Sequence, residues 1–249
     1  MRGWRVLVTR PEAAELSRLL RARGAIPIAI PLIEIRSVDA GGKLDAAARA
    51  IGRYDWVVVT SANGARALIE RMRTLGIRLP ESVRWAAVGP ATAAELGAGG
   101  VRVTAVPRAA TGAAIAGELG ALAGARVLLP RSRIAAEDLP AALAVRGARV
   151  DEVPAYETVI GPESSRGPLA AALDAGLEAA IFTSGSTVAG FVRLAGDASV
   201  ALAGVTTVCI GPATARALEG VGVRPARIAA RRSAESLVHA LEEVAHARA

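Results

Sequence analysis

Short apolar runs alternate with amphipathic stretches of Ala, Leu and Arg along the whole chain, and this pattern predicts its secondary structure. The run Arg5–Thr9 predicts a strand, and the amphipathic segment after it predicts a helix that begins at Pro11 and ends at Gly24. Runs of the same kind predict further strands at 26–30, 55–60, 84–88 and 102–106. Because strands alternate with helices throughout, the pattern favours an α/β fold with doubly wound parallel sheets.

The second half of the chain repeats the patterns of the first half at a spacing of 121 to 123 residues. The matching parts are 5–9 with 126–130, 57–68 with 180–191, 86–96 with 208–218, and the helix starts expected near Thr111 and Ser233. Several matches at one spacing indicate a duplication. We predict two similar domains, each with a five-stranded parallel sheet and helices on both faces, because about ten strands crowd a single twisted sheet.

Two partitions of the duplicated chain into domains fit this pattern. A cut near residue 123 would separate the two repeats. Alternatively, the stretches near 34–43 and 157–167 could be linkers, since the first contains Gly41-Gly42 and the second contains Pro162 with two serines. These two stretches occupy equivalent places in the repeat. The residue pattern leaves both partitions open.

The composition excludes several classes of protein. Hydrophobic residues make up 52% of the chain but aromatic residues only 3%, which suits small aliphatic side chains packed between helices and parallel strands. No apolar run approaches the roughly 18 residues that a membrane span needs. The single cysteine, Cys209, excludes an internal disulfide and a cysteine-rich metal site. We therefore expect a cytoplasmic protein without a metal site.

The net charge of +7 is carried almost entirely by arginine, and Lys43 is the only lysine. A general preference for Arg over Lys would produce this charge without any ligand. The arginines are scattered along the chain, which argues against binding of nucleic acid. The charge gives modest support to a small anionic substrate.

Repeated turns carry the candidate binding residues. Each turn follows an apolar strand and precedes a helix, where ligands bind in open parallel sheets, and free N–H groups of a helix start attract carboxylates. The candidate residues in these turns are Ser61, Asn63, Gly89, Thr92, Ser184, Ser186, Gly211 and Thr214. Ordinary capping of helices by Ser and Thr is the alternative explanation for any one of these turns.

Three further side chains could act on a substrate. Arg10 and Arg131 follow the first strand of each repeat and could each bind a carboxylate with two hydrogen bonds. Exposure to solvent, or a salt bridge to an acid such as Glu12 or Glu137, is the alternative for both arginines. Tyr156 follows a strand, and its phenol could donate a proton to a leaving oxygen. Packing between domains is the alternative for Tyr156.

Several of these segments together resemble the uroporphyrinogen-III synthase family. The segments are VLVTRPE, YDWVVVTSANGARAL, AAVGPATAAEL, VPAYETV, IFTSGSTVAGF and VCIGPATARAL, and they cover essentially the whole chain in order. The resemblance implies two flavodoxin-like domains joined by two linker strands. On this chain, residues 1–36 and 161–249 would form one domain, and residues 37–157 the other.

The resemblance also implies an activity. The substrate would be hydroxymethylbilane, a linear tetrapyrrole with eight carboxylates, and the enzyme would use no cofactor. It would remove the hydroxyl group, invert ring D through a spiro intermediate and close the macrocycle to uroporphyrinogen III. Tyr156 would assist the departing hydroxyl, and Thr214, Ser61, Thr92 and Ser184 would match the small polar residues of the substrate cleft.

Two other functions remain open at this point. The same fold could serve as a non-catalytic, clamshell binding module for an anionic metabolite. Binding of nucleic acid would predict a steep dependence on salt, but the chain carries no recognised motif for it. A monomer is expected, because no long apolar seam is evident.

Overall fold

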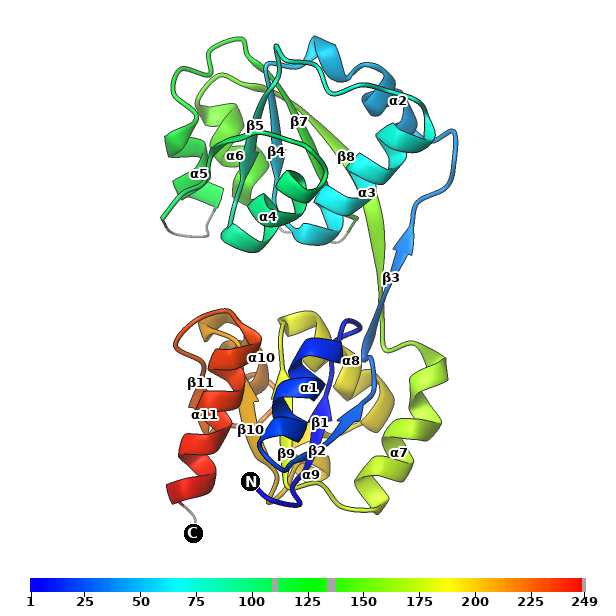
Figure 1. Cartoon of the computed structure of the whole chain (residues 1–249), viewed down its shortest axis with the longest axis vertical. Coiled ribbons are helices and arrows are strands. Elements are labelled where there is room, and N and C mark those ends of the chain that lie inside the picture. Colours follow the sequence, from blue (N-terminus) through cyan, green and yellow to red (C-terminus); the bar gives the residue numbers. More distant parts are fainter. Residues whose placement is uncertain (109–111, 134–137, 248–249) are drawn as a thin grey trace. The chain divides into compact units, whose positions relative to one another are not determined.

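The computed structural model describes residues 1–108, 112–133 and 138–247. The chain forms two compact units (Figure 1). Unit 1 consists of Met1–Glu34 and Val159–Ala249, and unit 2 of Ile35–Thr158. The chain leaves unit 1 within strand β3 (Ile33–Ser37) and returns within strand β8 (Arg149–Ile160).

Unit 1 is built on a five-stranded sheet in the order β11-β10-β9-β1-β2, and every strand pair in it is parallel. Numbered along unit 1, this order is 2-1-3-4-5, which is the flavodoxin-like arrangement. The strands are β1 (Arg5–Val8), β2 (Ile26–Ala29), β9 (Ala179–Phe182), β10 (Thr206–Cys209) and β11 (Arg227–Ile228). The sheet of unit 1 is therefore five-stranded and parallel, as the pattern predicts.

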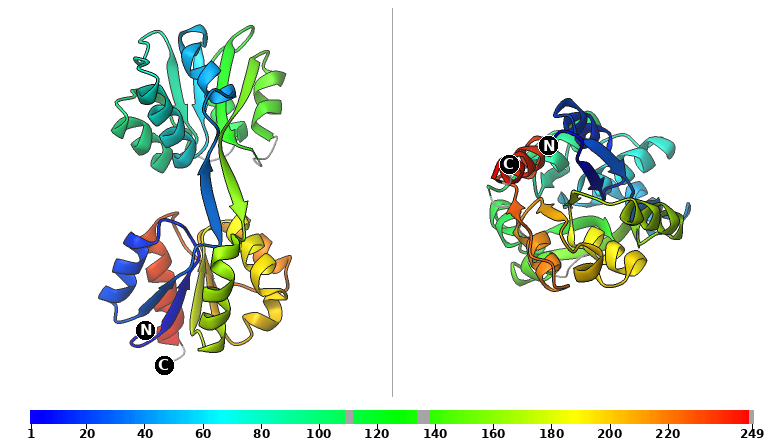
Figure 2. Two further views of the ribbon diagram at one scale, coloured as in Figure 1. Left: turned by 90° about the vertical axis from the view of Figure 1, so that its right-hand side faces the viewer. Right: turned by 90° about the horizontal axis from the view of Figure 1, so that it is seen from below.

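Helices cover both faces of this sheet (Figure 2). Helices α1 (Ala14–Ala22) and α11 (Ala234–Ala247) pack on one face, where Leu16, Leu20 and Leu237 meet Val6 and Val8. The other face carries α7 (Arg166–Asp174), α8 (Gly185–Ala195), α9 (Ala198–Ala201) and α10 (Pro212–Glu219), preceded by the 3-10 turn η2 (Glu163–Ser165). Buried strands flanked by helices on two sides explain the aliphatic runs in the sequence.

The first helix begins later than its proline predicts. Helix α1 starts at Ala14 rather than at Pro11. The N–H of Ala13 instead bonds to the carbonyl of Pro11 at 3.0 Å, so residues 11–13 form a tight turn and the first helical bond runs from Ser17 to Ala13. The expected end is correct, because Gly24 adopts the left-handed conformation with φ of 78°.

Unit 2 contains a six-stranded sheet in the order β3-β8-β7-β4-β5-β6. Strands β4 (Trp56–Val59), β5 (Arg84–Ala87) and β7 (Arg126–Ser132) lie inside the sheet, and β6 (Val103–Ala105) lies at the edge opposite β3. The prediction of a purely parallel five-stranded sheet is wrong for this unit, whose sheet is mixed. The reason is that β8 extends over twelve residues and pairs along its outer edge with β3, which lies partly in a stretch expected to be a linker.

Two groups of helices cover the sheet of unit 2. Helices α2 (Lys43–Arg49), α3 (Ala62–Thr74) and α4 (Pro90–Ala98), with the 3-10 turn η1 (Ile51–Arg53), pack on one face. Helices α5 (Gly112–Glu118) and α6 (Asp138–Val145) pack on the other. The helix start expected near Thr111 falls outside the described residues, and α5 is described from Gly112.

The duplication is visible in the order of the strands. Read from one edge, β6-β5-β4-β7-β8 of unit 2 corresponds to β11-β10-β9-β1-β2 of unit 1. Strands that match in sequence therefore occupy the same positions in the two sheets. Turns that match in sequence consequently lie at the same positions along the carboxyl edge of each sheet.

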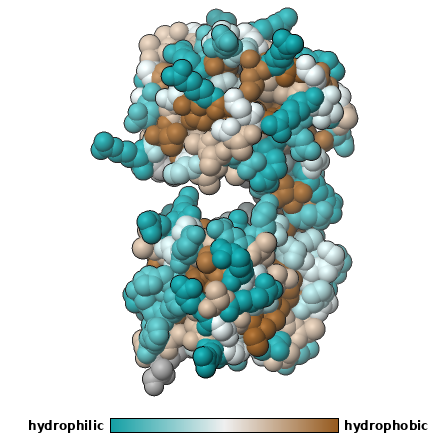
Figure 3. All heavy atoms as spheres, in the orientation of Figure 1, coloured by the Kyte–Doolittle hydropathy of each residue, from teal (hydrophilic) through white to brown (hydrophobic). Residues whose placement is uncertain are grey.

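The surface carries few large apolar side chains. On the face shown in Figure 3, hydrophilic residues interrupt the apolar areas of both units. Among the described residues, the exposed large apolar side chains belong to separate segments: Ile26, Val106, Val145, Val200 and Ile228. No helix in the described ranges is long and apolar enough to cross a membrane.

Tyr54 provides a test of packing in unit 2. Its hydroxyl donates to Asp151 Oδ2 at 2.9 Å, and its burial, followed by this hydrogen bond, raises the pKa of Tyr54 to about 12. An unfolded tyrosine has a pKa of about 10, so the folded state keeps the proton to higher pH. The stabilisation is present below pH 10 and is lost as the pH rises from about 10 to about 12.

We therefore expect the difference in urea midpoint between the wild type and Tyr54→Phe to shrink across this pH window. Equilibrium unfolding at closely spaced pH values measures it. A difference that stays constant between pH 9 and pH 12 would contradict the assignment.

Candidate active site

The candidate residues lie at the carboxyl edges of the two sheets, near the point where the strand order reverses. In unit 1 this point lies between β1 and β9, and in unit 2 between β7 and β4. Arg10 and Ser184 follow the first pair, while Arg131 and Ser61 lie at the end of the second pair. Ligands of doubly wound sheets bind in the crevice at this position.

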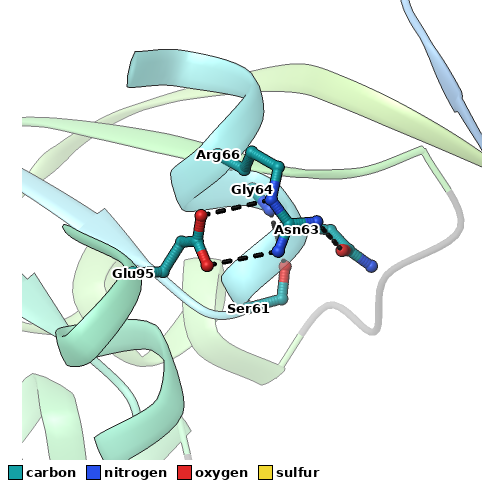
Figure 4. Close-up of polar contacts among 5 residues, drawn as sticks. All are labelled: Ser61, Asn63, Gly64, Arg66 and Glu95. Carbon is teal, nitrogen blue, oxygen red and sulfur yellow. Dashed lines mark hydrogen bonds and ion pairs between the residues drawn. The ribbon is translucent and has the colours of Figure 1, made fainter. Parts of the chain in front are cut away.

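Ser61 caps helix α3 in unit 2 (Figure 4). Its backbone is extended, with φ of −148°, and its Oγ accepts a hydrogen bond from the N–H of Gly64 at 3.0 Å. A Cβ on Gly64 would lie 3.1 Å from the carbonyl oxygen of Pro130, so the helix start packs tightly against β7. The capping role expected for this serine is confirmed.

Tyr156 reaches the same hydroxyl group. Its phenol oxygen lies 2.9 Å from Ser61 Oγ, and either atom can be the donor. Tyr156 is 9% exposed and belongs to β8, which is 95 residues away from Ser61 in sequence. The structure thus brings together two residues that the sequence proposes separately.

Asn63 and Arg66 occupy the first turn and a half of α3 (Figure 4). The guanidinium of Arg66 donates to both carboxylate oxygens of Glu95 on α4, at 3.1 and 3.2 Å. It also donates to Asn63 Oδ1 at 3.4 Å. This ion pair joins the two helices whose starts face the carboxyl edge, and it holds the Asn63 amide in place.

The Gly-Pro-Ala-Thr turns begin α4 and α10. Gly89 and Gly211 are the capping residues, and a proline follows each as the first helical residue, as predicted. Neither glycine has a side chain that could accept a hydrogen bond from the free N–H groups. Thr92 and Thr214 lie in the first turn and are buried. These two helix starts therefore keep backbone donors available for an anion.

Ser184 caps α8 in unit 1 through a reciprocal pair. Its Oγ accepts from the N–H of Thr187 at 3.1 Å, and Thr187 Oγ1 accepts from the N–H of Ser184 at 3.3 Å. Ser186 is half-buried in the first turn of the same helix. The expected cap is confirmed, and both groups of the capping box are occupied within the turn.

The two equivalent arginines differ. Arg131 is buried, and its guanidinium donates to Glu152 Oε2 on β8 at 3.0 Å. Arg131 thus forms a salt bridge with Glu152, an acid that the sequence analysis did not consider, and Glu137 lies outside the described residues. Arg10 is half-buried and makes no ion pair with a residue in the described ranges. The two arginines therefore lie in different surroundings, and the binding of a carboxylate by either stays a prediction.

Sequence reasoning missed three residues at these edges. Arg232 is exposed, and its Nε would lie 3.5 Å from a Cβ on Gly211, beside the start of α10. Ser132 and Thr158 place their hydroxyl oxygens 3.3 Å apart next to Tyr156. Arg232 precedes the last helix in an Arg-Arg-Ser run, which reads as ordinary surface charge and gave no signal.

Among the described residues, no group of three His, Cys, Asp or Glu side chains could hold a metal ion. Cys209 is fully buried in β10, and its burial raises the pKa of the thiol. The groups present at the carboxyl edges are hydroxyls, backbone N–H groups and arginines.

Comparison with known proteins identifies the family. The family model described as uroporphyrinogen-III synthase HemD matches residues 14–239. The chain belongs to the uroporphyrinogen-III synthase family. It is 30% identical over 229 residues to the uroporphyrinogen-III synthase of Synechococcus elongatus, covering 85% of this chain and 84% of that protein. The family makes it a cyclising lyase of haem biosynthesis.

A second relative is longer. The chain is 30% identical over 248 residues to the porphyrin biosynthesis protein HemD of Ruminiclostridium josui, covering 97% of this chain. It spans about half of that protein, 49% of its length. The resemblance between the two proteins therefore concerns one part of the longer relative.

Solved structures share the fold. A mutant uroporphyrinogen III synthase of Thermus thermophilus matches with a TM-score of 0.72 and 23% identity, covering 98% of this chain and 99% of that one. The uroporphyrinogen-III synthetase of Helicobacter pylori matches with a TM-score of 0.66 and 18% identity, covering 98% and 100%. These likenesses support an α/β fold of the uroporphyrinogen-III synthase type.

Proposed function

We propose that this chain converts hydroxymethylbilane into uroporphyrinogen III, inverting ring D through a spiro intermediate and using no cofactor. The observation that carries the proposal is the phenol of Tyr156, which lies against the start of helix α3 in a member of this family. A proton donor beside a helix start suits the loss of a hydroxyl group from a polycarboxylate.

The chemistry begins with departure of the hydroxyl group. The C–O bond breaks with its electron pair going to oxygen, and a proton from Tyr156 completes a molecule of water. The pyrrole nitrogen delocalises the positive charge left on carbon. Ring D then attacks this carbon, forms the spiro intermediate and rearranges before the macrocycle closes. The last step releases one proton from a ring carbon, so the net loss from the substrate is water.

Binding of the substrate carboxylates falls to the helix starts and to arginine. In this proposal the helix starts bind carboxylates through their N–H groups, those of α8 and α10 in unit 1 and those of α3 and α4 in unit 2. The turns contribute Ser61, Asn63, Thr92, Ser184, Ser186 and Thr214. Arg10 adds a cation at the end of β1. Gly89 and Gly211 let the substrate approach the backbone. Holding the reacting carbons in position contributes to the rate, because the substrate stabilises its own cation.

We further propose that units 1 and 2 are the two domains of this family. Their boundaries at Glu34/Ile35 and Thr158/Val159 lie close to those that the resemblance implies.

Product analysis tests the function. The protein is incubated with freshly made hydroxymethylbilane, and the isomers are separated by chromatography after oxidation to porphyrins. Formation of isomer III above the isomer I that forms spontaneously is expected. Isomer I alone would overturn the proposal and leave a non-catalytic module that binds an anionic metabolite.

Arg232 allows a test of carboxylate binding. Arg232→Ala should raise KM about 10-fold with little change in kcat, because it removes a charged hydrogen-bond donor next to the start of α10. Arg224→Ala is the matched control, since it removes the same charge just before β11, at the amino edge of the same sheet. Initial rates over a range of substrate concentrations measure both variants. Equal changes in KM would indicate a general effect of charge.

A further inference from the structure

The hydroxyl of Ser61 contacts two partners, the helix start and the phenol of Tyr156. We infer that Ser61 is a positioning residue, which donates a hydrogen bond to the phenol oxygen of Tyr156 while Tyr156 gives up its proton. The inference rests on the proposed function. It assigns to Ser61 a role in the proton transfer in addition to capping a helix.

An irregularity in β8 aims Tyr156 at Ser61. Arg131 pairs with Pro154 but Ser132 pairs with Tyr156, so Ala155 is an extra residue in β8. In a regular strand Ala155 and Tyr156 would point to opposite faces. Here both pack in the apolar cluster on the side of α3. Such irregularities re-aim side chains and are frequent next to active sites.

The cap leaves the hydroxyl proton of Ser61 available to Tyr156. One lone pair of Ser61 Oγ accepts the N–H of Gly64 at the positive end of α3. The hydroxyl can rotate about its C–O bond, so its proton can point to Tyr156 Oη at 2.9 Å. A hydroxyl that already accepts a hydrogen bond is a stronger donor. The proton of Tyr156 is then free for the substrate.

The equivalent turn in unit 1 shows the difference. Ser184 occupies the same position, but its third helical residue is Thr187, whose side chain completes the capping box. In unit 2 that third residue is Gly64, which has no side chain, and the place near the serine is taken by the phenol of Tyr156. The capping serine of unit 1 therefore bonds within its own turn, whereas the capping serine of unit 2 also contacts Tyr156.

The proton that Tyr156 donates is restored by the end of the reaction. Tyr156 transfers its proton to the leaving hydroxyl as the C–O bond breaks, which gives water and a phenolate. The hydroxyl of Ser61 stabilises the phenolate by donating a hydrogen bond to it, and Ser61 keeps its own proton throughout. The proton that the ring carbon loses when the macrocycle closes restores the phenol.

Spectroscopy tests the hydrogen bond without relying on activity. The chain has two tyrosines, so protein labelled with 13C at the ring carbon that bears the hydroxyl should give two signals. Tyr54→Phe assigns them. Ser61→Gly, which costs a helix cap only a few tenths of a kcal/mol, should move the signal of Tyr156 and leave that of Tyr54 in place. Two unmoved signals would overturn the inference.

Kinetics test the role. Ser61→Gly should lower kcat about 10-fold with a smaller change in KM, whereas Ser61→Thr, which keeps the hydroxyl, should retain most of the activity. In a Tyr156→Phe background, Ser61→Gly should change kcat less than about 2-fold, because the phenol that it assists is already gone. Asp197→Ala removes the cap of α9 and should leave kcat unchanged. An equal loss in both backgrounds would show that Ser61 only caps the helix. A wild type that forms no isomer III would instead refute the proposed function.

Discussion

Gly190→Ala should abolish or severely weaken folding of unit 1. A Cβ at this position would overlap the carbonyl oxygen of Leu32. Leu32 cannot move away easily, because its N–H bonds to the carbonyl of Thr9 and its carbonyl accepts the N–H of Gly161, each at 2.9 Å. We expect a loss of about 3 kcal/mol or more of stability, or a fall in Tm of about 10 °C.

The same helix provides the matched control. Gly185→Ala places a Cβ 3.6 Å from the Cβ of Ala217, which is an ordinary contact, and it should leave Tm unchanged within a few degrees. Thermal unfolding followed by circular dichroism compares the two variants. A Gly190→Ala protein that unfolds at the temperature of the wild type would refute the close approach of α8 to Leu32.

Local signals in the sequence predict much of this fold. Pro90 and Pro212 begin helices because proline has a fixed φ that suits the first helical residue. Gly24 ends a helix because glycine readily adopts a positive φ. The prediction that a helix starts at Pro11 is wrong, because the N–H of Ala13 bonds to the carbonyl of Pro11 in a turn that precedes the helix. The sixth strand was also missed, because β3 exists only through its pairing with the distant β8.

Long-range contacts limit how much of the candidate site the sequence predicts. Ser61 and Tyr156 were each proposed from the sequence, but their contact depends on one extra residue in β8, which no local pattern marks. The partner of Arg131 was missed for the same reason, since Glu152 becomes its neighbour only through the pairing of β7 with β8. Arg232 reaches Gly211 across a loop. The contacts of Tyr156 and Arg131 follow from sheet register, which one sequence does not specify at single-residue precision.

Tyr156→Phe should lower kcat by about 10- to 100-fold while KM changes little. General acids contribute roughly 100-fold or more to many reactions. The lower end is expected here, because the pyrrole substrate stabilises the cation that remains when its hydroxyl group leaves. The phenyl ring of the variant keeps the packing of a side chain that is 9% exposed, so the fold should persist. Initial rates of isomer III formation at saturating substrate measure the effect.

Tyr54→Phe is the control that this chain offers, since it removes the only other phenol. Tyr54 bonds to Asp151 and precedes β4, so it lies at the amino edge of the sheet. Tyr156 instead contacts Ser61, which follows the carboxyl end of β4. We expect the control to retain the kcat of the wild type. If both variants lose activity equally, the loss reports damage to packing in unit 2, and if neither does, Tyr156 is not the proton donor. Only a selective loss in Tyr156→Phe supports the role that its contact with Ser61 indicates.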